Sequence, residues 1–286
     1  MLDHSSNSRR FSVALNPATI RGYNLPIEEQ IRLISAAGFE ATEPWQADVA
    51  NFVERGGTLE ELKKRLEDAN LKVCGLMSFA TWAQDDPAAR AQGLEDVRRD
   101  METVLAIGGE SIAIPPMGFQ RAPSAPPVDV FVDRYAEVCK IAEQLGAYGT
   151  LEVWGHSAIF SKLSEAIYVA TAVGSPRATL LLDAYHLYKG DGLKAYESLK
   201  LVAGNRMRNF HLNDFPDKPL PELVDGDRVL PGEGIAPLDY IQDILFENGY
   251  RGFMSLEIFN KEYWAAYPDP AEFLNLCAEK AFAAVK

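Results

Sequence analysis

The sequence has few of the residues that stabilise secreted or nucleic-acid-binding proteins. Among 286 residues there are three cysteines, Cys74, Cys139 and Cys277, and no two of them form a C-x-x-C pair. An odd, widely spaced set argues against a disulfide framework and favours a reduced, cytoplasmic protein. Only 28 lysines and arginines stand against 41 acidic residues, for a formal net charge of −13. Because phosphate backbones bind basic surfaces, we expect no nucleic-acid partner.

Long apolar runs and glycine-rich nucleotide motifs are also missing. No run of about 20 apolar residues could span a bilayer, so we expect no membrane partner. Residues 1–10 are polar and lack the apolar core of a signal peptide. We interpret them as a disordered lead-in to a single domain, residues 11–286. Neither G-x-G-x-x-G nor a Walker A motif occurs, which argues against an open nucleotide-binding sheet.

What the sequence does contain is a regular alternation of two kinds of segment. Short β-branched or aromatic runs recur, and some, such as TLLLD, are apolar throughout, as in strands covered on both faces. Between them lie segments with apolar residues at helical spacing, several of which end at glycine or asparagine. We predict strands at 11–16, 39–43, 72–79, 111–115, 150–154, 179–183, 208–213 and 253–259. We predict helices at 26–37, 59–69, 87–107, 128–145, 161–173, 193–203, 237–248 and 270–285.

Eight strand–helix units in strict alternation predict an α/β fold, a single (β/α)8 TIM barrel. Such a barrel typically has about 250 residues, which suits the length of this chain. An open doubly wound sheet is the alternative, although it usually has fewer strands and a glycine-rich first turn. The longest stretch without periodicity, 213–237, follows the seventh predicted strand. A long loop there would lie on the functional face of a barrel.

Four successive predicted strands bring polar residues to the end of the barrel where active sites lie. The residues are Glu152, Asp183, His211 and Glu257, and each stands in an apolar run. Unpaired charges are costly to bury there, and a shared cation would remove that cost. Oxygen ligands with one imidazole suit one divalent metal ion: Mn²⁺, Mg²⁺, Co²⁺ or Zn²⁺. The alternative is that these residues form salt bridges or cap the following helices.

Three more candidates for the substrate site lie in the loops after these strands. His156 and His186 begin two of the loops beside the predicted metal ligands, although a single histidine is more often structural. Arg228 precedes the turn-forming run P-G-E-G at 231–234, which would fold the long loop over the barrel mouth. Its planar guanidinium could then reach substrate oxygens. The alternative is a surface arginine paired with Asp225 or Asp227.

Strand ends supply the remaining candidates for substrate contact. Asn16 and Glu43 end the first two predicted strands, and Trp154 ends the fifth. Aromatic walls are frequent in sugar and polyol sites, but an aromatic residue at a strand end also simply packs well. We predict that all three residues line the site of a small-molecule substrate.

Six motifs give the chain a resemblance to a known family. They are L-N-P-A-T at 15–19, E-V-W-G-H at 152–156, L-D-A-Y-H at 182–186, F-H-L-N-D at 210–214, D-R-V-L-P-G-E-G at 227–234 and S-L-E-I-F-N-K-E-Y-W at 255–264. In these residues the chain resembles the xylose isomerase-like TIM barrel sugar phosphate isomerases and epimerases, whose superfamily also contains endonuclease IV. Within that family it is most similar to the inosose isomerases of inositol catabolism.

The resemblance implies a function for each of these residues. Glu152, Asp183, His211 and Glu257 would bind one divalent metal ion, and Glu152 and Glu257 would also act as acid and base. His186 and Arg228 would contact substrate oxygens. The reaction would be the isomerisation or epimerisation of a sugar or keto-polyol through a cis-enediolate.

Other functions fit parts of the same evidence. A metal-dependent dehydratase of a keto-polyol or a dehydroshikimate-like acid would need the same proton abstraction. A sugar-binding barrel without activity would need the same pocket. A nuclease would need a zinc cluster with many histidines, whereas this acidic chain has four. The sequence leaves the substrate, the metal and a possible homo-oligomer open.

Overall fold

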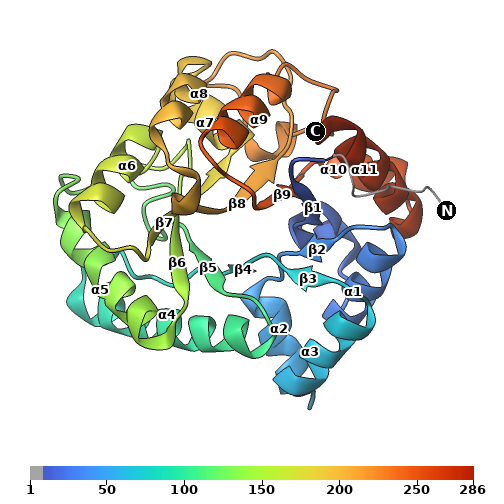
Figure 1. Cartoon of the computed structure of the whole chain (residues 1–286), viewed down its shortest axis with the longest axis horizontal. Coiled ribbons are helices and arrows are strands. Elements are labelled where there is room, and N and C mark those ends of the chain that lie inside the picture. Colours follow the sequence, from blue (N-terminus) through green and yellow to red (C-terminus); the bar gives the residue numbers. More distant parts are fainter. Residues whose placement is uncertain (1–8) are drawn as a thin grey trace.

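The computed structural model describes residues 9–286, which form a ring of parallel strands surrounded by helices (Figure 1). Nine strands form one sheet in the order β3-β2-β1-β9-β8-β7-β6-β5-β4. The two end members, β3 (Lys72–Val73) and β4 (Leu76–Met77), follow each other directly in the chain and together make the third predicted strand. The sheet therefore closes, and the predicted (β/α)8 barrel is confirmed. Residues 1–8, most of the predicted lead-in, lie outside the described residues, so the domain boundaries stay predictions.

The other predicted strands are found close to their expected places. They are β1 (Ser12–Leu15), β2 (Ala41–Thr42), β5 (Ser111–Ile114), β6 (Tyr148–Glu152), β7 (Ala178–Asp183), β8 (Met207–Leu212) and β9 (Phe253–Leu256). The third strand is divided because it changes partner. Val73 pairs with Thr42 of β2, whereas Leu76 pairs with Ile112 of β5. The segment thus bridges its two neighbours with two short ladders.

Every predicted helical segment contains a helix. These helices are α1 (Ile27–Ala36), α3 (Leu59–Asp68), α4 (Pro87–Ala106), α5 (Val130–Leu145), α6 (Leu163–Ala172), α8 (Lys194–Ser198), α9 (Leu238–Glu247) and α11 (Pro270–Ala284). Further elements lie in the βα connections, and four of them closely follow a strand: the 3-10 helix η1 (Pro17–Tyr23), α2 (Gln46–Glu54), α7 (Ala184–Asp191) and α10 (Lys261–Ala266). The prediction missed them because each follows its strand almost directly and is short. Within the described residues, no helix is both long and apolar enough to cross a membrane.

Alternation along the strands separates the apolar core from the inside of the barrel. Most buried apolar side chains form one cluster between the strands and the outer helices. The inward positions instead carry small apolar residues and polar ones, such as Ala14 on β1 and Ser255 on β9. Because side chains on a strand repeat every two residues, inward-facing Leu181 places Asp183 inward as well. The carboxyl ends of the strands therefore direct polar groups towards one another.

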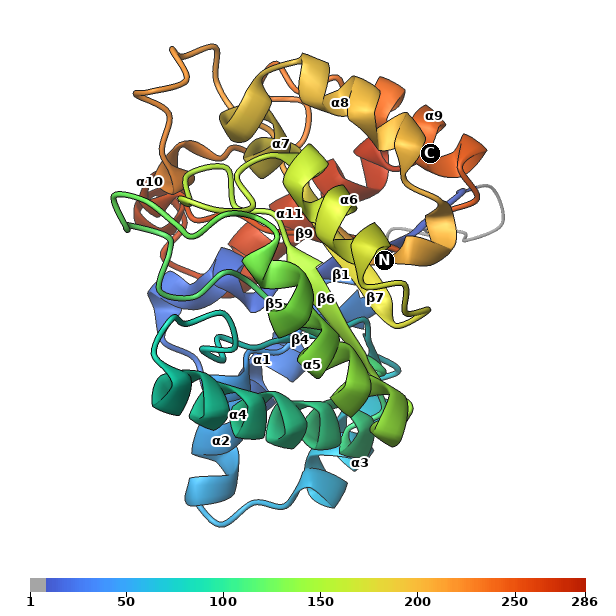
Figure 2. The same ribbon diagram turned by 90° about the vertical axis from the view of Figure 1, so that its left-hand side faces the viewer.

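The long loop after β8 is folded around one buried carboxylate. Asp214 accepts four backbone hydrogen bonds, from the N–H groups of Phe215, Gly232, Gly234 and Ala236, at 2.8–3.0 Å. Its own backbone also pairs with that of Val229 in an isolated antiparallel bridge. Figure 2 shows this loop, in orange, on the same side of the barrel as α10. The predicted return of the loop over the barrel mouth is thus achieved largely through Asp214.

Replacing Asp214 with alanine should destabilise the protein. The change leaves four backbone donors without their acceptor, and we expect a loss of about 3 kcal/mol in the free energy of unfolding. Urea denaturation followed by circular dichroism measures this loss. Asp217→Ala, which removes an exposed carboxylate from the same loop, is the control and should change stability little. Equal stabilities for the two variants would show that Asp214 does not hold the loop.

Candidate active site

Four polar side chains meet where β6 to β9 end, and His211 lies among them. Its Nδ1 atom is 3.2 Å from Glu257 Oε2, 3.6 Å from Asp183 Oδ2 and 4.0 Å from Glu152 Oε1. All four side chains are at least 97% buried. The predicted cluster is therefore assembled in space by four different strand ends.

The donor atoms of this cluster fit a divalent cation. His211 Nδ1 and Glu152 Oε2 are buried and have no hydrogen-bond partner among the described residues. The ligand atoms of Asp183, His211 and Glu257 lie within 4.8 Å of one another. Ligands about 2 Å from an ion lie about 3–3.5 Å apart, so small side-chain shifts would complete the coordination. One imidazole with carboxylate oxygens suits several divalent metals.

Glu43 sets the orientation of the His211 ring. Its Oε2 lies 2.8 Å from His211 Nε2, and the same oxygen accepts hydrogen bonds from Asn16 Nδ2 at 3.0 Å and Ser255 Oγ at 3.2 Å. An ionised carboxylate only accepts hydrogen bonds, so the proton of the ring lies on Nε2. Nδ1 faces the other three carboxylates, and in the neutral ring its lone pair would be available to a cation placed among them. A partner of this kind is usual for a histidine that binds a metal.

The charges of the cluster depend on one another. Burial raises the pKa of Glu152 to about 8, although His211 opposes the shift. Burial would lower the pKa of His211, yet Glu257 and Glu43 raise it well above its usual range. Burial would likewise raise the pKa of Asp183, but Arg228 and His186 hold it well below its usual range. Protons on Glu152 and His211 therefore reduce the repulsion within the cluster. A bound cation would supply the same positive charge.

Asp183 links this cluster to the following helix. Its Oδ1 accepts a hydrogen bond from the His186 N–H at 2.9 Å and caps α7. Its Oδ2 accepts from Asn213 Nδ2 at 3.0 Å and faces His211. Asp183 thus caps the following helix and also belongs to the cluster, so both interpretations of the sequence apply to it.

Arg228 is fully buried beside the cluster, in contrast to the surface alternative. Its Nη1 atom is 3.1 Å from Asp225 Oδ1, so the predicted pairing with Asp225 does occur. Its Nη2 atom is 3.0 Å from His186 Nε2 and 3.4 Å from Asp183 Oδ2. The rings of Tyr185 and Phe259 lie 4.3 and 5.0 Å from the guanidinium carbon. These contacts hold the guanidinium in one orientation.

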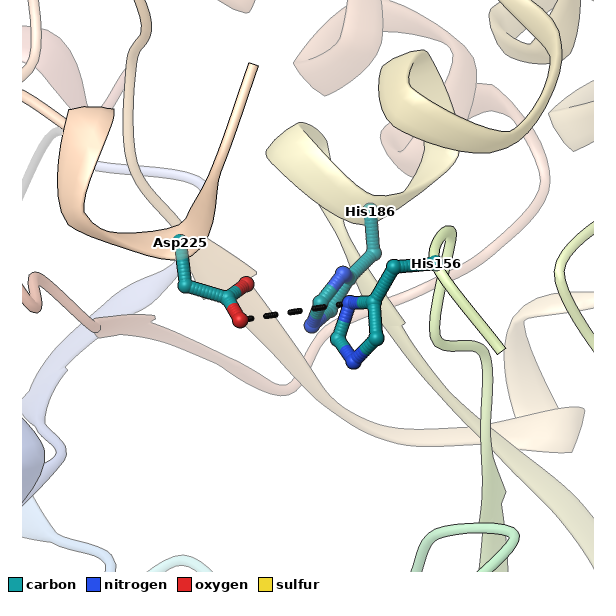
Figure 3. A group of neighbouring side chains, drawn as sticks. All are labelled: His156, His186 and Asp225. Carbon is teal, nitrogen blue, oxygen red and sulfur yellow. Dashed lines mark ion pairs between the residues drawn. The ribbon is translucent and has the colours of Figure 1, made fainter. Parts of the chain in front are cut away.

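His156, His186 and Asp225 form a second polar group above the first (Figure 3). His156 stacks on Trp154, with ring centroids 5.5 Å apart, and its Nδ1 lies 3.9 Å from Asp225 Oδ2. Burial and Arg228 lower the pKa of His186 to about 3, which makes the ring neutral. A cation among these three residues would lie against the Arg228 guanidinium, and like charges repel strongly away from water. The group is therefore better suited to hydroxyl groups than to a second metal ion.

A cavity of about 190 Å³ opens onto both polar groups. Its wall is largely aromatic and carries a few polar groups. This combination is expected of a site for a small ligand such as a sugar. The lining residues are Trp45, Met77, Phe79, Glu152, Trp154, His156, His186, Asp225, Glu257 and Phe259. No lysine or arginine occurs among these ten residues.

The predicted residues take different places around this cavity. Trp154, His156 and His186 line it together with Glu152 and Glu257. Asn16 and Glu43 lie behind the cluster instead, where Asn16 donates hydrogen bonds to Glu43 and to Glu257 Oε1.

Sequence reasoning missed five residues that line the cavity: Trp45, Met77, Phe79, Asp225 and Phe259. Asp225 was considered only as a partner of Arg228, because the path of the long loop could not be followed in the sequence. Phe79 and Phe259 stand at the ends of predicted strands, where an aromatic residue can equally pack outwards. The alternation of side chains along each strand would have been the only signal for them.

Comparisons with known proteins agree with this geometry. Residues 31–277 match the family model of the xylose isomerase-like TIM barrel. The chain belongs to this family. The inosose isomerase of Halalkalibacterium halodurans is 28% identical over 210 residues, which cover 72% of this chain and 73% of that protein. The fructoselysine 3-epimerase of Escherichia coli O157:H7 is 21% identical and covers 82% of this chain and 86% of its own length.

A solved structure shows the same fold. The crystal structure of the IolI protein with a bound zinc atom has a TM-score of 0.85 and 24% identity, and it covers 95% of this chain and 96% of that chain. Membership of the family and the named relatives identify the chain as an enzyme of the isomerase and epimerase class.

Gly155 allows α7 to approach the loop that carries His156, and alanine there should disturb the site. A Cβ atom at this position would lie 2.4 Å from the His186 carbonyl oxygen and 2.8 Å from the Gly190 nitrogen. We expect Gly155→Ala to lower the free energy of unfolding by about 1–3 kcal/mol, as measured by urea denaturation. Gly226→Ala is the control, because its Cβ would meet nothing closer than 3.9 Å. A Gly155→Ala variant as stable as this control would contradict the close approach.

Proposed function

We propose that the chain is a divalent-metal-dependent isomerase or epimerase of a sugar or keto-polyol. The observation that carries this proposal is the unpartnered Nδ1 of His211, which is directed at three buried carboxylates on the floor of a cavity. Glu152, Asp183, His211 and Glu257 would hold one metal ion. The names of the relatives, inosose isomerase and fructoselysine 3-epimerase, support this class of substrate.

The reaction that suits these groups moves a proton next to a carbonyl through a cis-enediolate. A bound divalent cation supplies Lewis-acid stabilisation of the charge that develops on the enediolate oxygens. Glu152 and Glu257 both line the cavity, so each can reach a substrate carbon. One of them removes the carbon-bound proton, and one returns a proton to the neighbouring carbon or to the other face. General acid–base help of this kind contributes about 10²–10⁴ in rate.

Other residues would bind and orient the substrate. Arg228 and His186 lie beside the carboxylates. Arg228 would donate to substrate oxygens, and the neutral His186 ring would donate to or accept from them. Trp154 would pack against the apolar face of a sugar or polyol ring, and His156 would contact a hydroxyl group at the cavity mouth. Asn16 and Glu43 would act from behind, by holding Glu257 and His211.

The cavity favours a substrate without a phosphate group. Its ten lining residues include three carboxylates and no lysine or arginine. Arg228, the nearest buried cation, is already balanced by Asp225 and Asp183. A volume of about 190 Å³ suits a ligand of monosaccharide size rather than a disaccharide. We therefore propose an unphosphorylated keto-polyol or ketose.

Glu152→Gln should abolish proton transfer while leaving the barrel folded. The amide is almost the same size as the carboxyl group but cannot act as a base, so we expect a loss of about 10²–10⁴ in rate. The measurement is NMR of deuterium incorporation beside the carbonyl, over a panel of inososes, ketohexoses and hydroxypyruvate with added metal. Glu54→Gln, an exposed change on α2, is the control. Exchange at the unmodified rate in Glu152→Gln would exclude this role.

The same experiment separates isomerisation from dehydration. Isomerisation and epimerisation conserve the mass of the substrate, whereas a dehydratase yields a product lighter by one water. Mass spectrometry of the product from the unmodified enzyme therefore decides which reaction follows proton abstraction. A product that has lost water would overturn the isomerase proposal and favour the dehydratase.

Changes at Glu43 should weaken metal binding although this residue would not touch the metal. In Glu43→Gln the side chain can still accept from His211 Nε2 but lacks the charge, so we expect the affinity for metal to fall about tenfold. Glu43→Ala removes the acceptor, and we expect the affinity to fall about a hundredfold. Competition with a chromogenic chelator measures zinc affinity in each variant. Glu54→Gln again serves as the control. Unchanged affinity in both Glu43 variants would show that Glu43 does not orient His211 for a metal.

A further inference from the structure

A second and larger cavity lies on the other side of Trp45 from the active site. Its volume is about 420 Å³, and it is formed by η1, the segment between η1 and α1, the start of α1, and one side of α2 as far as its C-cap Arg55. It shares no lining residue with the catalytic cavity. Its lining residues are Pro17, Ile20, Arg21, Asn24, Leu25, Pro26, Ile27, Gln30, Asp48, Asn51 and Arg55. We call it the η1 cavity.

Two acceptors in the η1 cavity lack sufficient donors. Gln30 is 7% exposed, and its Nε2 donates to the Leu25 carbonyl at 2.9 Å and to Asp48 Oδ2 at 3.4 Å. Its Oε1 is buried and has no partner among the described residues. Burial raises the pKa of Asp48, as expected for a carboxylate with only this one long hydrogen bond. Asp48 is therefore complementary to the hydroxyl donors of a ligand, and Gln30 holds it in position.

Arg21 stands close enough to Asp48 to oppose the rise in its pKa, but it forms no ion pair with it. The Arg21 guanidinium carbon lies 4.0 Å from the centre of the Trp45 ring. Within residues 9–286, no carboxylate forms an ion pair with Arg21. Arg55, in contrast, is bonded to Glu28 Oε2 at 2.8 Å and to Asn51 Oδ1 at 3.0 Å. Arg21 therefore keeps the planar fork that binds carboxylate or phosphate oxygens well.

We propose that the η1 cavity is a second ligand site, for a small polyhydroxylated anion. The carboxylate or phosphate of the ligand would bind Arg21, and its hydroxyl groups would donate to Asp48, which Gln30 Nε2 holds in place. This chemistry is opposite to that of the catalytic cavity, which has carboxylates and no lining cation. A sugar acid or sugar phosphate would thus bind in the η1 cavity.

The site is connected to the active site through Trp45. Trp45 Nε1 donates to Asn16 Oδ1 at 2.8 Å, and Asn16 Nδ2 donates to Glu257 Oε1 at 3.1 Å. An anion that binds Arg21 competes with the Trp45 ring for the guanidinium. Occupancy of the η1 cavity should therefore change the surroundings of the Trp45 indole, which gives the site an optical signal.

The test is titration of the full chain with D-gluconate and with D-glucose 6-phosphate, followed by calorimetry and by tryptophan fluorescence. We expect saturable binding with a dissociation constant on the order of 1 mM for at least one of them. The tighter of the two identifies carboxylate or phosphate as the preferred anion. D-glucose, which has the hydroxyl groups without the charge, should bind at least about tenfold more weakly.

Matched variants locate the binding. Arg21→Ala should weaken it about tenfold, because one charge-assisted contact is lost. Gln30→Leu should weaken it by removing the hydrogen bond that holds Asp48. Arg32→Ala removes an exposed arginine of α1 that does not line this cavity and should leave affinity unchanged. Two results would overturn the proposal: no binding of either anion at about 100 mM, or equal affinity in Arg21→Ala.

Discussion

The active end of the barrel depends on a single imidazole held between carboxylates. Glu43 binds one nitrogen of His211 from within the barrel, and the other nitrogen faces Asp183, Glu257 and Glu152. Four carboxylates so close together repel one another away from water. Positive charge at their centre, as a proton on His211 or as a cation, is the condition under which these strand ends can stay together. The atoms that need positive charge for the fold to be stable are thus the same atoms that would bind the metal ion.

A second constraint is the way in which the long loop after β8 is tied down. The carboxylate of Asp214 gathers backbone N–H groups from both ends of this loop. The loop can then carry Arg228 into the interior, where aromatic rings and Asp225 hold it. A buried arginine is tolerated only when it is paired. The organisation of the loop and the charge of the cluster therefore support each other.

Much of this architecture could be predicted from the sequence, for identifiable reasons. Strand and helix periods alternate eight times, and the polar residues of the cluster interrupt apolar strands, so the barrel and the four strand-end residues could be recognised. The short helix α7 could not, because Asp183 ends a strand and caps a helix at once. The place of Glu43 behind His211, rather than in the cavity, depends on which face of β2 points inwards. In a strand of two residues the sequence pattern gives no period to decide this.

The division of the third strand has a consequence for how the barrel moves. The ladders on either side of it contain two residue pairs each, whereas β8 and β9 share four. Together with the equally short ladder between β1 and β2, this part of the wall is the most weakly cross-linked section of the cylinder. Local opening begins where backbone pairing is sparsest. The amide protons of residues 72–77 should thus be among the first of the strand amides to exchange with solvent. The barrel should open locally at this strand while the strands around the carboxylates stay paired.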